Sequence, residues 1–277
     1  MHRAIVVFVE NKSNLLSELN ILHTSLDHIC CLDTDLVVFG PRAALNKVPN
    51  SCIKIECMVP SNDPKWKKYH FINSIACIND KSYSYLDKYT HILRCDADTL
   101  VTPAWHNFQP DTYTTGKGGY VNDDYTREKL ISIANHLGLR HQGIFNIGST
   151  HYGTSKHVKE VCMLTAEIAE YILKTEFLQD EGKWPGWFRG VILLYASDLA
   201  VNHLVTNPNM SHNLLDFDST SSDLIASHPH IHCWHTQSKF SKFSFHKGAY
   251  NHINKNSLNT DIVHDYCLYM ALKSIGK

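Results

Sequence analysis

The segment HILRCDADTLVTPAW, residues 91–105, runs from an apolar stretch into two acids that are separated by one small residue. Its apolar beginning is typical of a buried β-strand, and Asp96 and Asp98 follow where that strand would end. In α/β proteins, ligands bind beyond the carboxyl ends of parallel strands. The segment therefore predicts a strand of a central sheet and a functional site at the end of that strand.

The first hundred residues alternate short apolar runs with helix-compatible segments. Runs rich in Val, Ile and aromatic residues, each typical of a strand, cover residues 4–9, 36–39, 53–58 and 90–95. Helix-compatible segments between them cover residues 14–23 and 67–79. Alternation of this kind indicates an α/β fold with a mostly parallel sheet.

The second half of the chain continues this pattern. Residues 142–156 are expected to contain a strand, residues 155–173 a long helix, and the histidine-rich residues 228–236 a further strand. Ser197 or its neighbour is placed to cap a helix that begins with Asp198. There is no internal repeat and no long linker, so a single domain is the simpler interpretation.

The composition is that of an ordinary globular protein in which positive and negative charges nearly cancel. The 277 residues include 26 Lys and Arg against 27 Asp and Glu, a formal net charge of −1, which gives no basis for binding nucleic acid. Nine cysteines without a CxxC pair are typical of buried, reduced thiols. No apolar run approaches the ~18 residues of a membrane span, and residues 1–10 indicate a first strand rather than a signal peptide. A soluble, cytoplasmic protein is therefore expected.

Asp96 and Asp98 form a pair of oxygen ligands. Hard divalent cations such as Mg²⁺ and Mn²⁺ prefer carboxylate and phosphate oxygens. The same spacing is common in solvated surface turns, so the pair alone indicates little. Its position after a buried strand and before the turn-forming Thr102-Pro103 favours a metal site.

Three segments, in this order, resemble those of GT-A-type glycosyltransferases, which use a nucleotide sugar and a divalent cation. LRCDADTLVTP resembles their metal-binding D-x-D segment, FNIGSTHYG a strand that follows it, and HIHCWHTQSKFSK their C-terminal histidine and lysine segment. These segments span residues 91 to about 242, and residues 4–10 fit the first nucleotide-binding strand. The compact size is similar to that of soluble members from bacteria and from large DNA viruses.

The resemblance implies a GT-A-like, Rossmann-type mixed and mostly parallel sheet flanked by helices, in a single domain of residues 1–277. Residues 1–105 would bind the nucleotide sugar, and residues 106–277 would bind the acceptor and supply a C-terminal metal and diphosphate segment. The implied reaction moves a sugar from a nucleoside diphosphate donor, such as UDP-xylose, UDP-glucose or UDP-galactose, to a hydroxyl of a glycan. Mn²⁺ or Mg²⁺ is the implied cofactor.

The resemblance also implies the metal ligands. Asp98 would bind the cation directly, and Asp96 would face the ribose or the water shell of the metal. A histidine near the C-terminus would complete the site, and His235 is preferred because it ends the expected strand just before the basic segment, with His232 as the alternative.

A competing zinc site would use His228, His230 and His232, which alternation places on one face of a strand. The rise along a strand would hold the outer two roughly 13 Å apart. That separation is too large for one tetrahedral ion.

The remaining expected contacts concern the donor, the acceptor and the base. Donor contacts are expected from Val9, Glu10, Tyr69, Asn73, Arg94, Asp96, Lys239 and Lys242. Acceptor contacts are expected from Trp184, Trp187 and Asn146. An inverting reaction, which is favoured here, needs a carboxylate that takes the proton of the acceptor hydroxyl. Asp198 is the expected base, with Asp123 and Asp124 as alternatives.

Two other function classes stay open. A metal-dependent nucleotidyltransferase or phosphohydrolase would use the same carboxylate pair, although the chain has neither GxxxxGK[ST] nor GxGxxG. A non-catalytic glycan-binding module would depend on the tryptophans, and the acids would then be structural.

Overall fold

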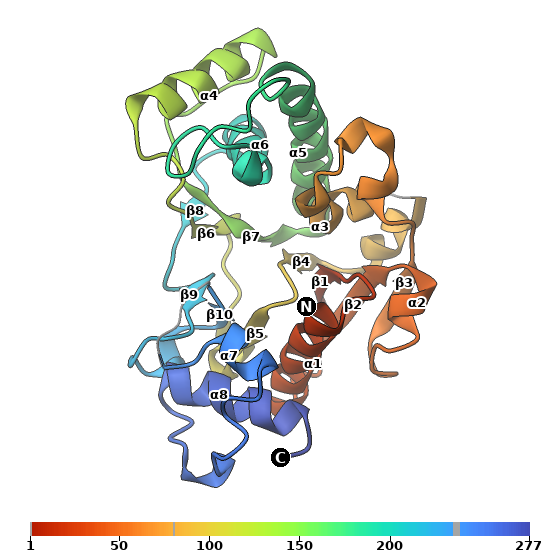
Figure 1. The fold of residues 1–277 in the computed structure, drawn as a ribbon, viewed down its shortest axis with the longest axis vertical. Coiled ribbons are helices and arrows are strands. Elements are labelled where there is room, and N and C mark those ends of the chain that lie inside the picture. The colour runs from red at the N-terminus through yellow and green to blue at the C-terminus, as the bar shows by residue number, and fades with distance from the viewer. Residues whose placement is uncertain (1, 80, 235–238) are drawn as a thin grey trace.

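A computed structural model describes residues 2–79, 81–234 and 239–277, and its main feature is a seven-stranded sheet (Figure 1). The strand order is β3-β2-β1-β4-β7-β6-β8. Their bounds are β1 (Arg3–Phe8), β2 (Thr34–Gly40), β3 (Ile53–Glu56), β4 (His91–Arg94), β6 (Thr114–Lys117), β7 (Ile147–Thr154) and β8 (Asn209–Met210). Neighbouring strands from β3 to β4 pair in parallel, as do β6 and β8, whereas β7 is antiparallel to both β4 and β6. The predicted α/β fold with a mostly parallel sheet is confirmed.

The first strand explains why the sheet is covered on both faces. Every residue of β1 is buried, and successive side chains of a strand point to opposite faces. Val6 and Phe8 pack into one apolar cluster, while Ile5 and Val7 pack into another. A continuous apolar strand of this kind needs helices on both sides, since each buried Val or Ile contributes about 1.5–3 kcal/mol.

Helices supply that cover on each face. In Figure 1, α4, α5 and α6 lie above the main sheet, and α1 and α8 lie below it. The helices are α1 (Ser13–His28), α2 (Arg42–Leu45), α3 (Asn73–Ala76), α4 (Asp124–His136), α5 (Ser155–Thr175), α6 (Ile192–Leu204), α7 (Lys242–His246) and α8 (Val263–Ser274). Short 3-10 helices cover Pro60–Asn62, Pro64–Trp66, His70–Ile72, Cys77–Asn79, Lys81–Lys88, Pro103–Asn107, Arg189–Val191, Ile225–Ser227 and Lys255–Ser257. In the described part of the chain, no helix combines the length and apolar character needed to cross a membrane.

A second, three-stranded sheet carries the histidine-rich segment. Its order is β5 (Thr99–Val101), β10 (His230–His232) and β9 (Phe217–Asp218). Strand β10 is antiparallel to β5, with His232 opposite Thr99, and parallel to β9. Because β5 follows the two acids directly, this pairing brings a distant histidine strand beside them.

Two expected helices differ from the prediction. The helix expected over residues 67–79 begins only at His70, and consecutive short 3-10 and α-helical segments then continue to Asn79. Lys67 and Lys68 adopt left-handed φ values of 47° and 61°, which an α-helix excludes. Helix α6 begins at Ile192, so Asp198 lies inside it rather than at its first turn. The helices predicted for residues 14–23 and 155–173 are confirmed by α1 and α5.

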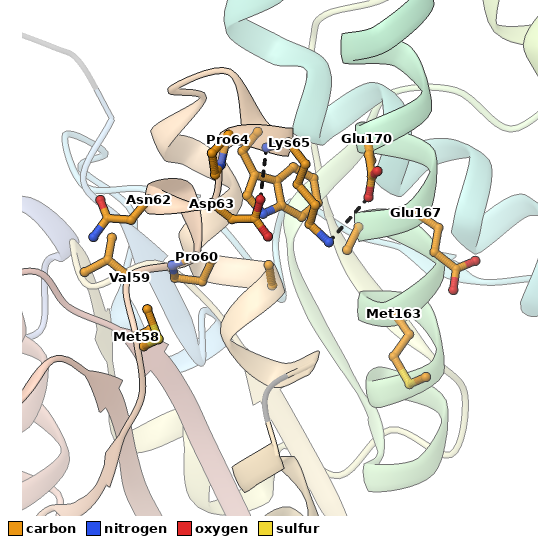
Figure 2. Close-up of a pocket in the computed structure, with 13 residues that line it drawn as sticks. Met58, Val59, Pro60, Asn62, Asp63, Pro64, Lys65, Met163, Glu167 and Glu170 are labelled. Carbon is orange, nitrogen blue, oxygen red and sulfur yellow. Dashed lines mark hydrogen bonds and ion pairs between the residues drawn. The ribbon is translucent and has the colours of Figure 1, made fainter.

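A cavity of about 710 Å³ lies between α5 and the segment that follows β3 (Figure 2). Met58, Pro60 and Met163 give it an apolar lining, and Lys65 reaches Glu170 across it at 3.4 Å. Among the described residues that line this cavity there is no histidine, and neither Asp96 nor Asp98 lines it. It is therefore separate from the acids that follow β4.

Candidate metal centre

Asp96, Asp98 and His232 meet at the carboxyl end of β4. Each offers one ligand atom, and these atoms all lie within 4.8 Å of one another. The acids lie between β4 and β5, and the pairing of β10 with β5 places His232 beside them. The backbone fixes this approach, because the Cys233 N–H donates to the Asp98 carbonyl at 2.9 Å.

Asp98 is the most enclosed acid of this group, with its side chain 13% exposed. One carboxylate oxygen lies 3.3 Å from His232 Nε2, and the other accepts from Lys242 Nζ at the start of α7. Burial alone would raise the pKa of Asp98, but His232 and Lys242 outweigh it and hold the pKa below its usual value. Asp98 is therefore an ionised carboxylate whose negative charge is balanced by two cationic side chains.

Asp96 is more open, with 36% of its side chain exposed. Arg94 donates to it at 2.7 Å, and the same buried guanidinium donates to the carbonyls of Ser74 and Ser149. Arg94 thus orients Asp96 from within the core. Arg94 was expected to contact the nucleotide. Its side chain is instead 1% exposed, and its N–H groups donate to Asp96 and to the two carbonyls.

His232 lies between two carboxylates. Its Nε2 faces Asp98, and its Nδ1 lies 3.1 Å from an oxygen of Asp216. Burial would lower the pKa of His232, but Asp98 and Asp216 raise it well above its usual value. A cation that binds at Nε2 therefore displaces a proton.

Asp216 and Glu18 belong to the same neighbourhood, and the sequence interpretation missed both. Asp216 comes directly before β9. Glu18 lies on the buried face of α1, and burial, followed by the charge of Asp98, raises its pKa to about 7. An acid four residues before the buried Leu22 was the sequence signal for Glu18, since that spacing places both on one helix face.

The donor set fits a divalent cation that accepts both carboxylate oxygen and imidazole nitrogen, such as Mn²⁺. The competing three-histidine zinc site finds no support among the described residues. His228 Nδ1 lies 3.0 Å from the Asn213 carbonyl, and His230 Nδ1 accepts the backbone N–H of Asp216 at 3.1 Å. The preferred ligand His235 lies outside the described residues, and the alternative His232 is the histidine that reaches Asp98.

The expected donor residues occupy two regions. Lys242 donates to Asp98, one of the three residues of the metal group, which consists of Asp96, Asp98 and His232. Lys239 donates to the Ser222 hydroxyl. Near the end of β1, Asn73 donates to Glu10 at 3.2 Å and accepts the Ser61 N–H at 2.7 Å.

Val9 and Tyr69 are both buried. The Tyr69 hydroxyl accepts the Leu193 N–H at 2.8 Å, and the ring packs in the apolar core. The expected contact between Tyr69 and the nucleotide-sugar donor is therefore not supported.

Asp198 is fully buried and engaged within the chain. Its carboxylate accepts from the Tyr120 hydroxyl at 2.8 Å and from Asn202 Nδ2 at 3.1 Å, and lies 3.7 Å from His141 Nε2. Burial raises its pKa. A base must reach the acceptor hydroxyl, so the geometry supports a structural role for Asp198 instead.

The two alternative bases lie at the start of α4. Asp123 caps the helix by accepting the Thr126 N–H at 2.7 Å, whereas the side chain of Asp124 is 94% exposed. Neither belongs to the metal group.

Two expected acceptor residues are also engaged internally. Trp187 stacks on Phe177 and on Tyr195, with ring centroids 5.3 and 4.5 Å away, and is partly buried. Asn146 has a left-handed φ of 65°, and its Oδ1 accepts the backbone N–H groups of Tyr120 and Val121. Trp184 is 47% exposed and keeps a surface that a ligand can reach.

A protein-family model, described as "Domain of unknown function (DUF7164)", matches residues 1–276. No curated protein matches the chain. The family description carries no activity, so the chemistry of the site is the basis for a functional hypothesis.

Proposed function

Because this chain belongs to the DUF7164 family, whose description assigns no activity, we propose a function from its site. The proposed reaction is metal-dependent transfer of a sugar from a nucleoside diphosphate, UDP-linked, to a hydroxyl of a glycan. We propose that the enzyme is a glycosyltransferase of the GT-A type. The observation that carries the proposal is the group of Asp96, Asp98 and His232 at the carboxyl end of a central parallel strand.

Each residue of the group has a defined part in the proposal. Asp98 and His232 hold the cation, and Asp96, oriented by Arg94, contributes a second carboxylate. When bound, the cation supplies Lewis acidity toward the diphosphate oxygens. Lys242 adds a positive charge beside Asp98, where a diphosphate would approach.

Two finer expectations stay predictions. Inversion of the anomeric carbon requires a carboxylate that reaches the acceptor, and the expected Asp198 is buried. The division into a nucleotide-sugar half, residues 1–105, and an acceptor half, residues 106–277, rests on the resemblance alone.

The test is a panel of UDP-sugars and GDP-sugars incubated with the protein and Mn²⁺, with products identified by mass spectrometry. The panel includes UDP-xylose, UDP-glucose and UDP-galactose. Slow donor hydrolysis by a glycosyltransferase breaks the bond between the sugar C1 and oxygen, which yields UDP and free sugar. A phosphohydrolase breaks the diphosphate instead and yields UMP and sugar 1-phosphate, so the products separate the two enzyme classes.

Asp98→Asn is expected to reduce turnover at least a hundredfold, since it removes a charged metal ligand. The matched control is Glu128→Gln, which neutralises an exposed acid on α4. Normal Mn²⁺-dependent turnover by Asp98→Asn would contradict the role of Asp98. Glycan binding without turnover of any donor would favour the binding-module hypothesis, and pyrophosphate release from nucleoside triphosphates would favour a nucleotidyltransferase.

A further inference from the structure

We infer that Asp216 is a positioning residue that orients His232 and thereby sets the affinity of the site for its cation. This inference rests on the metal site of the proposed function. It concerns a carboxylate that lies behind the histidine ligand and is not one of the three residues whose ligand atoms converge.

The Asp216 side chain forms hydrogen bonds with His232 and with Thr150 of β7. Oδ1 lies 3.1 Å from His232 Nδ1 and also accepts from the Thr150 hydroxyl, while Oδ2 accepts the Thr150 N–H at 3.2 Å. The Asp216 side chain is 0% exposed, so water does not replace these partners. The carboxylate is thus fixed by β7 on one side and presents an acceptor to the imidazole on the other.

The backbone is shaped to hold this carboxylate. Asp216 has a left-handed φ of 61°, a conformation that costs free energy in residues other than glycine and often occurs at functional sites. A Cβ atom built on Gly116 would lie 2.1 Å from Asp216 Oδ2, and one built on Gly148 would lie 2.3 Å from the Gly116 carbonyl carbon. Glycine at position 116 therefore makes room for the acid, and glycine at position 148 lets β7 approach the backbone of Gly116.

This geometry determines which imidazole nitrogen is free. Asp216 accepts at Nδ1, so the proton stays on that nitrogen, and Nε2 is directed at Asp98, 3.3 Å away. A carboxylate behind a metal-bound imidazole fixes its orientation and raises its basicity, and losing such a partner costs 10–100-fold in affinity.

The experiment measures Mn²⁺ affinity by electron paramagnetic resonance of the free ion. Asp216→Asn, which keeps the shape and removes the charge, is expected to weaken Mn²⁺ binding about 10-fold, and Asp216→Ala about 100-fold. The control is Asp218→Asn on β9, two residues after Asp216, whose carboxylate accepts the Thr220 N–H at 2.9 Å; this variant is expected to bind Mn²⁺ like the parent protein. Circular dichroism checks that each variant is folded.

A second measurement needs no substitution. In Cd²⁺-loaded protein with ¹⁵N-labelled histidines, NMR is expected to show His232 bound through Nε2 with a proton on Nδ1. Coordination through Nδ1, or equal Mn²⁺ affinity in the parent, Asp216→Asn and Asp216→Ala proteins, would overturn the inference. Failure of the parent protein to bind Mn²⁺ would overturn the metal site as well, whereas Mn²⁺ binding without sugar turnover would overturn only the proposed reaction.

Discussion

Burial determines the ionisation of His151, a residue in β7 that is paired with β4. Its Nδ1 lies 3.2 Å from the Tyr113 hydroxyl and its Nε2 lies 2.9 Å from the Ser197 hydroxyl. Burial, with a smaller contribution from Arg94, lowers the pKa of His151 to about 3. The folded chain therefore holds this ring neutral at a pH at which an unfolded chain would protonate it.

Substitution of His151 by Gln is expected to flatten the pH dependence of stability. The folded pKa lies below the unfolded value, so the unfolded state takes up a proton as the pH falls from about 6.5 toward 3, and the free energy of unfolding decreases over this window. One such group contributes at most about 1.4 kcal/mol per pH unit. Urea unfolding at pH 4.5, 5.5 and 6.5 measures the slope.

The control for this prediction is His157→Gln, which changes an exposed histidine at the start of α5. Its ring is solvated in the folded chain as it is in the unfolded chain, so its substitution should leave the slope unchanged. Identical slopes for the parent and His151→Gln proteins would show that His151 is not held neutral.

Helix α4 begins directly after Asp123, whose side chain caps the helix. The Asp123 carboxylate accepts the Thr126 N–H at 2.7 Å and the Thr126 hydroxyl at 3.1 Å. These bonds satisfy a backbone donor that has no partner within the first turn. The acid that the sequence interpretation considered as a base thus has a clear structural use.

Asp123→Ala is expected to lower the free energy of unfolding by about 1 kcal/mol, the usual cost of losing an N-cap. Asp124→Ala, at the adjacent exposed position, is expected to change it by less than about 0.5 kcal/mol. Urea denaturation compares the two variants. If the Asp123→Ala protein is fully folded but has lost most of its sugar transfer, the capping role alone would be contradicted. Asp123 would then again be a candidate base.

The limits of helices could be predicted from the sequence where they depend on interactions between neighbouring residues. Both limits of α5 and the start of α1 were close to those expected, because apolar spacing along a helix is a local property, whereas α1 continues to His28. The helical segments within residues 67–79 begin only at His70, after two consecutive lysines in left-handed conformations that no local propensity indicates. Helix α6 begins six residues before Asp198, since apolar Ile192 to Tyr195 continue its buried face.

Across the whole molecule, the metal group connects the two sheets. Asp98 follows β4 of the main sheet, and His232 lies on β10 of the smaller one. In Figure 1, β5, β9, β10 and α7 lie on one side, below the main sheet. A cation held by both residues would add a link between parts of the chain that are far apart in sequence.

Mn²⁺ is therefore expected to stabilise the whole fold. At a free concentration 100 times its dissociation constant, it should raise the free energy of unfolding by about 2.7 kcal/mol. Thermal unfolding with Mn²⁺ and with a chelator measures this change. For amides that exchange through local opening, hydrogen exchange should slow in β5 and β10 and stay unchanged in α4. Asp98→Asn should lose both the stabilisation and the slower exchange. Slower local exchange of equal size along the whole chain would indicate nonspecific ion binding.

By itself, the sequence determined the α/β alternation and the position of two acids at the end of a central strand, because apolar periodicity and strand ends are properties of neighbouring residues. The tertiary structure decided which distant groups join them. The pairing of β10 with β5 brings His232 to Asp98, and the packing of α7 brings Lys242 to the same carboxylate. The pairing of β10 with β9 brings Asp216 to His232. It also decided which polar residues are used internally, as Asp198 and Asn146 are. Both outcomes depend on strand register and burial, which are set by contacts between segments far apart in the chain.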